Sequence, residues 1–295
     1  YENKLKKKDI KILSLNFNQK DKLSFLIKKI IRLRYILRTI NPDIIQTWMY
    51  HSNFISIFIP KKYHHKIFWN IRHSELNFRI SKKLTILISF ICGFFSRLIP
   101  NKIIYCSEKS IRFHENIHFY SKKKTSLIYN GFSEKIYYPS KKLRTNFRKK
   151  NKIKKDPIIL GYAGRYAKQK NIETLLISFS KIINNYDNIY LFMAGKNINS
   201  ENIELKNLVL KYKVNKKVIF LGQQKELLEF YNGVDLLLLS SHSESFPNVI
   251  AESMLCSTPV ISSNAGCAKK IIGNSGFVLD KNDYISFTKG LNKTL

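Results

Sequence analysis

The chain has 295 residues and a formal net charge of +32, and 44% of its residues are hydrophobic. This length and apolar content allow one large or two medium folded domains, and they exclude a disordered chain. So large a positive charge predicts anionic partners such as nucleic acid, acidic lipid headgroups or phosphorylated substrates. Compositional bias explains the charge equally well, because Lys, Asn and Ile are abundant throughout the sequence, as in an A+T-rich genome.

The first half of the chain alternates short aliphatic runs with helical patterns. A helix is expected at residues 23–39, ending before Pro42. Residues 84–95 are apolar but too short to span a bilayer, which takes about 20 residues. We expect a buried core helix there, with an interfacial helix as the alternative. Strands are expected at residues 10–15, 43–47, 67–70, 102–106 and 125–128.

A basic and polar stretch at residues 140–156 separates this half from a second alternating series. It shows no face to bury, so we expect a linker there. Beyond it, strands are expected at residues 158–163, 189–194, 218–221, 235–239 and 260–262, and helices at 172–183, 201–212, 227–231 and 249–256. Strands that alternate with helices predict parallel βαβ units, and hence two doubly wound α/β domains with a cleft between them.

Two glutamates, Glu244 and Glu252, follow the expected strand at residues 235–239. Ligands of open α/β sheets bind just outside the carboxyl ends of the strands. Pro247 suits the first turn of the next helix, so the free N–H groups of Asn248 and Val249 would favour an anion at the same place. Carboxylates beside a phosphate site suit a ligand with both hydroxyls and phosphate, such as a nucleotide sugar.

Gly164, Arg165 and Lys170 follow the first strand of the second series. The glycine allows a ligand to approach the backbone, and the two cations could hold a diphosphate. By itself this segment would be an ordinary turn with two solvated cations. The two glutamates of the same domain favour the ligand-binding interpretation.

In the first half, His51 and the pair Arg72-His73 each follow an expected strand. A neutral imidazole of His51 facing the cleft could bind a sugar hydroxyl or a phosphate, although a lone histidine is more often structural. Arg72 and His73 could face an acceptor, or they could simply cap the helix that follows.

Other chemistries find little support in the sequence. The four cysteines form no CxxC pair or zinc spacing, which fits a reduced, cytosolic protein. No Asp-x-Asp metal motif, G-x-S-x-G motif or recognisable nucleic-acid-binding motif occurs. The chain shows no signal peptide, and it begins without Met, so we expect that its amino-terminal part is missing.

Together, several motifs resemble the group 1 glycosyltransferases, which are retaining enzymes of glycosyltransferase family 4 with the GT-B fold. They span nearly all of residues 157–280. They are Gly161-Tyr162-Ala163-Gly164-Arg165, Lys170-Asn171, Phe220-Leu221-Gly222, the segment from Glu244 to Glu252, Thr258-Pro259-Val260-Ile261-Ser262 and Gly276-Phe277-Val278. In the first half, residues 42–51 and 72–74 resemble a subgroup that builds surface polysaccharides on lipid carriers.

The resemblance implies two Rossmann-like domains that face a cleft. An acceptor-side domain would occupy residues 1–135, a basic linker 136–156, and a nucleotide-sugar-binding domain 157–295. The family opens with a glycine-rich loop and ends with further helices, neither of which we find. The resemblance therefore implies a fragment, with an incomplete first domain and a truncated second one, and such a fragment can keep a folded donor domain and yet be inactive.

The resemblance also implies roles for individual residues. Arg165 and Lys170 would neutralise a diphosphate in place of a metal, Glu252 would bind the ribose, and Glu244 would bind the transferred sugar. Glu244 and His51 would be the catalytic residues, with Arg72 and His73 on the acceptor side. The implied donor-binding residues are Gly164, Arg165, Lys170, Glu244, Phe246, Pro247, Asn248, Val249 and Glu252.

The implied activity is metal-independent hexosyl transfer with retention, from a nucleotide-diphosphate sugar, expected to be UDP-linked, to a lipid-linked or polysaccharide acceptor. No other cofactor and no specific nucleic acid are expected. The implied location is the cytoplasm, with contact to the anionic inner surface of the membrane. The alternative is a non-catalytic protein of the same fold that binds anions or membranes.

Overall fold

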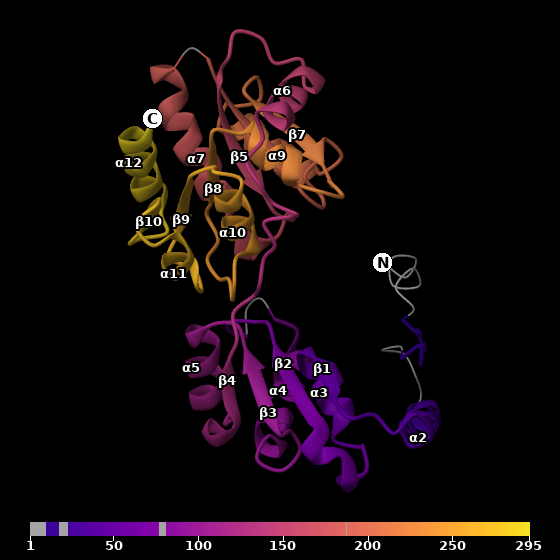
Figure 1. Cartoon of the computed structure of the whole chain (residues 1–295). Coiled ribbons are helices and arrows are strands. Elements are labelled where there is room, and N and C mark those ends of the chain that lie inside the picture. The colour runs from indigo at the N-terminus through magenta and orange to yellow at the C-terminus, as the bar shows by residue number, and fades with distance from the viewer. Residues whose placement is uncertain (1–9, 18–22, 77–80, 187) are drawn as a thin grey trace.

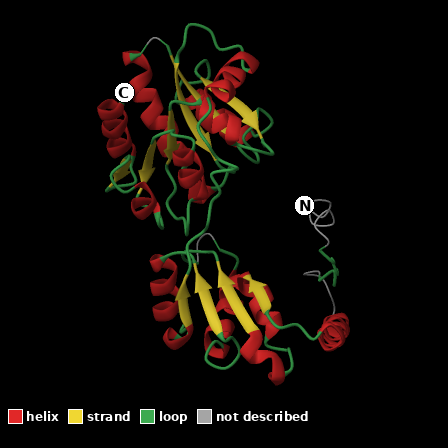
Figure 2. Ribbon diagram, viewed as in Figure 1, coloured by secondary structure: helices red, strands yellow, loops and turns green. Residues whose placement is uncertain are grey.

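The computed structural model describes residues 10–17, 23–76, 81–186 and 188–295. It contains two α/β units, each built around a parallel sheet (Figure 1). The predicted fold class, two parallel-sheet units in series, is confirmed. Figure 2 shows helices on both sides of the strands in each unit.

The first unit has a four-stranded sheet in the order β1-β2-β3-β4. Parallel neighbours in chain order require a crossover between each pair, and helices supply most of them. The core contains large side chains without exposed surface, such as Trp69 and Ile103. The strands are β1 (Ile45–Trp48), β2 (Ile67–Ile71), β3 (Lys102–Tyr105) and β4 (Thr125–Leu127), and the helices are α2 (Leu23–Ile40), α3 (Met49–Ser56), α4 (Lys83–Phe95) and α5 (Glu108–Ile117), with short 3₁₀ helices at Lys61–Lys66 and Lys122–Lys124.

The strand expected at residues 10–15 is not formed, so that prediction is wrong. Residues 10–17 have no regular secondary structure, and Ile10 and Leu13 are 46% and 48% exposed. An aliphatic run becomes a strand only when a neighbouring strand pairs with its backbone, and no described strand does so here.

Helix α4 packs as a core helix on one side, and the interfacial alternative remains a prediction. Ile86 and Cys92 are buried in the core of the first unit, as expected of a core helix. Leu87 and Phe94, on the other side, are 56% and 70% exposed. Among the described residues, no helix has the length and apolar character needed to cross a membrane.

The second unit has a six-stranded sheet in the order β10-β9-β8-β5-β6-β7. Chain order reverses between β5 and β8, which makes this a doubly wound sheet with a switch point there. The strands are β5 (Ile158–Ala163), β6 (Ile189–Ala194), β7 (Val218–Gly222), β8 (Leu236–Leu239), β9 (Val260–Ser263) and β10 (Phe277–Leu279). The helices are α6 (Lys141–Lys150), α7 (Ile172–Ile182), α8 (Ile203–Lys211), α9 (Leu228–Gly233), α10 (Asn248–Leu255), α11 (Ala268–Ile272) and α12 (Tyr284–Thr294), with 3₁₀ helices at Lys168–Lys170 and Ile183–Asn185.

Strand β8 shows why this sheet must be covered on both faces. Its four leucines are all buried, and they alternate between two cores. Leu236 and Leu238 pack into the core that contains α7 and α12, whereas Leu237 and Leu239 pack into the core that contains α9 and α10. A continuous apolar strand is the pattern typical of a parallel sheet that helices cover on both sides.

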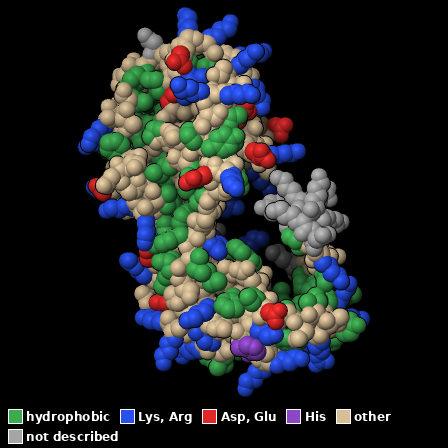
Figure 3. Space-filling view, viewed as in Figure 1, with side chains coloured by type: hydrophobic (Ala, Val, Ile, Leu, Met, Phe, Trp, Pro, Cys, Tyr) green, Lys and Arg blue, Asp and Glu red, His purple; other side chains and the backbone are tan. Residues whose placement is uncertain are grey.

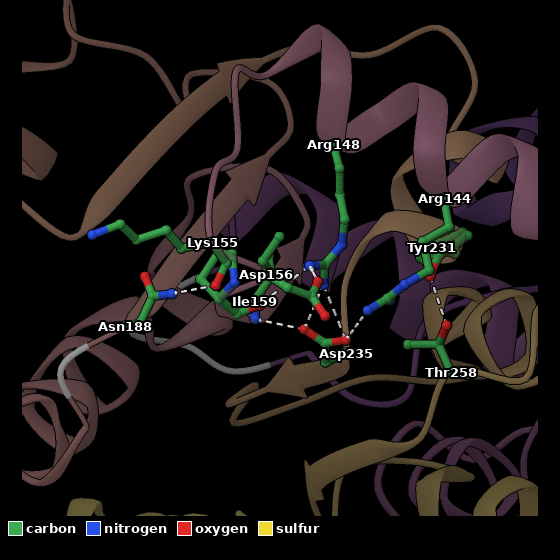
Figure 4. A network of polar contacts seen from close by, with 10 residues as sticks. Arg144, Arg148, Lys155, Asp156, Ile159, Asn188, Tyr231, Asp235 and Thr258 are labelled. Atoms are coloured by element: carbon green, nitrogen blue, oxygen red, sulfur yellow. Dashed lines mark hydrogen bonds and ion pairs between the residues drawn. The ribbon is translucent and has the colours of Figure 1, made fainter.

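The stretch expected to be a linker without a buried face contains helix α6, so the expectation of no buried face is wrong. Phe147 is only 4% exposed and packs against α9. On the same helix, Arg144 and Arg148 donate to the carboxylate of Asp235 at 2.7 and 2.9 Å (Figure 4). One aromatic side chain and two arginines thus attach a basic helix to the second unit.

The carboxyl ends of the strands in the first sheet point toward the second unit (Figure 2). Residues just beyond these strands contact the second unit directly. Glu108 accepts from Lys270 Nζ at 3.1 Å, and Cys267 Sγ lies 3.4 Å from the carbonyl oxygen of Cys106. The loops at the two sheet edges therefore meet, and the candidate site lies among them.

Candidate functional site

The switch point of the second sheet brings Glu244 and Lys170 together. Glu244 follows β8, and Lys170 lies in the 3₁₀ helix that follows β5, so the two segments are neighbours at one sheet edge. Their side chains form an ion pair and are only 12% and 14% exposed. Ser241 Oγ donates to the same carboxylate oxygen at 2.7 Å. The carboxylate of Glu244 and the ammonium group of Lys170 therefore neutralise each other, with little of either side chain exposed to solvent.

The loop that carries Glu244 is held at several points. The amide of His242 donates to the carbonyl of Gln169 at 2.8 Å, and Ser263 Oγ donates to the carbonyl of Ser241 at 2.6 Å. Gly266 has φ +60°, and a Cβ there would meet the carbonyl oxygens of Glu244 and Ser245 at 2.3 and 2.4 Å. Only glycine fits so close to that backbone, so the carboxylate has a defined position before any ligand binds.

Arg165 and His73 approach this carboxylate from the two different units. Arg165 is exposed at the end of β5, and its charge acts on His73. Burial is the main cause that lowers the pKa of His73 from its ordinary value, and the charge of Arg165 lowers it further. A neutral imidazole beside a carboxylate and a guanidinium can donate or accept a hydrogen bond.

A cavity of about 380 Å³ lies between the two units beside Glu244. Ser74 of the first unit and Ser243 of the second meet at 2.6 Å on its wall. Its lining includes His51, Arg72, His73, Gln169 and Glu244. Three of the residues predicted from the first unit therefore share one cavity with one of the two predicted glutamates.

Arg72 extends from this cavity toward a second one. Its Nη1 donates to Asn130 Oδ1 at 2.5 Å, and Asn130 Nδ2 donates to Asn248 Oδ1 at 2.7 Å. Asn248 is the first residue of α10, directly after Pro247. The three polar side chains thus form a chain of hydrogen bonds from the first unit to the helix that also carries Glu252.

Glu252 has different surroundings from Glu244. Tyr231 Oη on α9 donates to Glu252 Oε2 at 2.6 Å, and the hydroxyl of Tyr137 is a second hydrogen-bonding neighbour. Burial and the nearby carboxylate raise the pKa of Tyr231 well above its ordinary value, so the phenol keeps its proton and remains a donor. The two glutamates lie on one loop and helix, but they have separate polar partners.

Sequence reasoning missed several residues that shape the site, notably Ser74, Gln169, Ser243 and Gly266. Two of them contact each other only because the units meet, so no local pattern could show their role. Gly266 follows β9 at the same sheet edge, and the rule that ligands lie beyond strand ends would have drawn attention to it. Within the described ranges, no three or more His, Cys, Asp or Glu side chains form a group that could hold a metal ion.

A family model described as "Glycosyl transferases group 1" matches residues 144–295 of this chain. Among curated proteins, the capsular polysaccharide biosynthesis glycosyltransferase CapM of Staphylococcus aureus is 28% identical over 169 residues, which are 56% of this chain and 43% of that protein. The uncharacterized glycosyltransferase MJ1059 of Methanocaldococcus jannaschii is 27% identical and covers 92% of this chain and 70% of its own length. The matched part of this chain thus spans less than half of the length of CapM.

The fold resembles solved structures over almost its entire length. The structure of Anabaena Alr3699/HepE in complex with UDP-glucose superposes with a TM-score of 0.82 at 17% identity, covering 99% of this chain and 78% of that one. At such low identity the resemblance concerns the fold, including the arrangement of its two parallel sheets.

Proposed function

Because this chain belongs to the group 1 glycosyltransferases, we propose that it transfers a sugar with retention from a nucleotide-diphosphate sugar to an acceptor in cell-surface glycan synthesis. One observation supports this most directly. Gly164, Arg165, Lys170 and Glu244 gather at the switch point of the second sheet, where doubly wound folds bind nucleotides. The names of CapM, a capsular polysaccharide enzyme, and of the UDP-glucose complex support the pathway class and the UDP-linked donor.

In this proposal the donor lies along the edge of the second unit. Glu252 binds the ribose hydroxyls, and the amides of Asn248 and Val249 at the start of α10 contact phosphate or sugar. Phe246 and Pro247 shape the same turn. Arg165 and Lys170 neutralise the diphosphate, and Lys170 leaves its ion pair to do so. Glu244 is then free to accept hydrogen bonds from the hydroxyls of the transferred sugar.

The proposed transfer breaks the bond between the anomeric carbon and the diphosphate oxygen. The acceptor oxygen forms its new bond on the same face, and its proton moves to the departing diphosphate. Arg165 and Lys170 stabilise the charge that develops on the leaving group, which is the task a metal ion performs in other transferases. His51 and His73 hold hydroxyl groups near the reacting carbon from the first unit, so catalysis rests mainly on positioning and charge.

We propose a lipid-linked or polysaccharide acceptor that approaches from the first unit, and a protein that acts in the cytoplasm at the inner membrane surface. Helix α2 supports contact with an acidic membrane. Phe25, Ile31 and Tyr35 are 54%, 59% and 69% exposed, and five Lys and Arg residues lie on the same helix. Basic amphipathic helices bind such surfaces through apolar area and charge together.

Nucleotide binding and sugar transfer test the enzymatic proposal separately. Near 100 times its dissociation constant, UDP should stabilise the protein by about 2.7 kcal/mol and raise its melting temperature by about 5 °C or more. Transfer is measured with radiolabelled UDP-sugars and a lipid-linked oligosaccharide. A protein that no nucleotide diphosphate stabilises would refute the donor site, and nucleotide binding without transfer would favour the non-catalytic alternative.

A further inference from the structure

A second cavity of about 580 Å³ lies beside the one that contains Glu244, and the two share Arg72 in their linings. Its lining comes from both units. The residues are Trp48, Arg72, Cys106, Tyr129, Asn130, Gly131, Phe132, Phe246 and Asn248. Arg72 is the only ionisable Lys, Arg, Asp, Glu or His side chain in this lining.

The positive charge of Arg72 has no carboxylate partner among the described residues. Its side chain donates hydrogen bonds to two neutral amide oxygens, Asn130 Oδ1 at 2.5 Å and Asn70 Oδ1 at 3.3 Å. Its Nε is buried and has no hydrogen-bond partner within the described part of the chain. Its guanidinium carbon lies 4.8 Å from the centre of the Trp48 ring. The guanidinium group stacks on this ring, but the ring does not neutralise its charge. Arg72 is half-buried, and a charge partly removed from water is stabilised by an anion, which no described residue supplies.

Aromatic side chains form another part of the lining of this cavity. The ring of Phe246 lies 5.9 Å from that of Phe132 in a stacked arrangement and 6.0 Å from that of Tyr129. Asn130 and Asn248 are hydrogen-bonded to each other in the same lining, and amide side chains carry both donors and acceptors. The cavity therefore offers one planar cation, two amides and an apolar wall.

We propose that Arg72, Asn130 and Asn248 form a diphosphate-binding site, with the Phe246 cluster of aromatic rings beside it. A guanidinium binds two phosphoryl oxygens at once through its parallel N–H groups. The inference builds on the proposed function, because it assigns substrate chemistry to the same cleft. The diphosphate is that of the acceptor's carrier, because the proposed function assigns the donor's diphosphate to Arg165 and Lys170. Because Arg72 lines both cavities, the acceptor's diphosphate would lie next to the sugar near Glu244.

Calorimetric titration with inorganic pyrophosphate tests the site with and without saturating UDP. Arg72→Gln should weaken pyrophosphate binding at least about tenfold, since it removes two charge-assisted hydrogen bonds. Arg72→Lys keeps the positive charge but loses the parallel N–H groups of the guanidinium. It should therefore weaken pyrophosphate binding, but by less than Arg72→Gln does. Arg112→Gln, which removes an exposed arginine on α5, is the charge-matched control and should leave binding within about twofold.

Asn248→Ala provides a second variant at an exposed position that should not disturb folding, and it should weaken pyrophosphate binding severalfold. Arg72-dependent pyrophosphate binding should persist with saturating UDP present, as expected for the acceptor's diphosphate. Binding that UDP abolishes would place the pyrophosphate in the donor site and overturn this assignment. Pyrophosphate affinity equal in the parent protein, Arg72→Gln and Asn248→Ala would overturn the proposal. This readout needs no sugar transfer, so it can fail while the proposed enzymatic function stands, and the reverse also holds.

Discussion

At the scale of single residues, two identical carboxylates have different partners. Glu244 contacts Lys170 and Ser241, whereas Glu252 accepts from Tyr231. A ligand's phosphate can replace Glu244 as the partner of Lys170. The carboxylate of Glu244 can then accept hydrogen bonds from sugar hydroxyls. Hydrogen bonds from phenols instead orient a carboxylate without neutralising its charge. The distinct neighbours suit the separate roles proposed for the transferred sugar and the ribose.

Conservative variants should separate these two roles. Glu252→Gln should weaken UDP binding about tenfold, since an amide accepts hydroxyl hydrogen bonds less well than a carboxylate. Glu244→Gln should lower the rate of transfer by more than it lowers UDP affinity. Calorimetry and a transfer assay on the same preparations supply both numbers.

Glu201→Gln removes an exposed carboxylate in another segment of the second unit, just before α8. It is the matched control for both variants. Tyr231→Phe retains Glu252 but removes its donor, so it should weaken UDP binding by a smaller factor than Glu252→Gln. Unchanged UDP affinity in Glu252→Gln and unchanged transfer in Glu244→Gln would show that the site residues are assigned wrongly.

At the scale of elements, helix α6 depends on a small polar cluster. Asp235 precedes β8 and receives hydrogen bonds from Arg144, Arg148 and the amide of Ile159, the last at 2.7 Å (Figure 4). The side chain of Arg148 is 11% exposed, so its charge is largely removed from water. This single carboxylate joins the helix before the second sheet to the first strand of that sheet.

Asp235→Asn should destabilise the protein by about 1–3 kcal/mol, because it leaves the nearly buried Arg148 without its full counter-charge. Urea unfolding followed by circular dichroism measures the free energy of unfolding. Asp280→Asn, an exposed aspartate in the same half of the chain, is the control and should change that free energy by less than about 0.5 kcal/mol. Equal stabilities of the two variants would mean that the carboxylate of Asp235 does not hold α6 in place.

At the scale of the whole molecule, charge and exposed apolar area coincide on α2. Lys and Arg side chains are spread over the surface of both units (Figure 3), in keeping with the net charge of +32. Helix α2 adds exposed Phe25, Ile31 and Tyr35, and its contact with the first unit includes a hydrogen bond from Tyr63 to the carbonyl of Leu37 at 3.1 Å. Membrane binding would then depend on more than net charge.

Binding to vesicles with acidic lipids should therefore fall steeply between low and high salt, and it should be weak to neutral vesicles. Ile31→Glu should reduce sedimentation with acidic vesicles severalfold. Ile203→Glu is the matched control, because Ile203 is 72% exposed on α8 of the second unit. Equal losses in both variants would attribute binding to overall charge and leave α2 without a special role.

Local chemistry in the sequence was sufficient for most of the strands and for bringing Lys170 and Glu244 to one sheet edge. Aliphatic runs such as residues 189–194 form strands because a short continuous apolar run suits a parallel sheet that helices cover on both faces. Glu244, Lys170 and Arg165 could be found because ligands lie beyond the carboxyl ends of parallel strands, a rule that needs only the order of elements. The predictions for residues 10–15 and 140–156 were wrong because the structure of these segments depends on contacts with residues distant in the sequence. A local sequence pattern does not reveal such contacts.

Which groups touch one another was decided only when the two units packed together. Ser74 meets Ser243, and Asn130 meets Asn248, across 169 and 118 positions of sequence. The pairing of Lys170 with Glu244 and the uncompensated charge of Arg72 likewise depend on which neighbours reach within hydrogen-bonding distance. Composition can predict that this chain binds anions, but the position of each anion depends on which cations the fold leaves without a carboxylate.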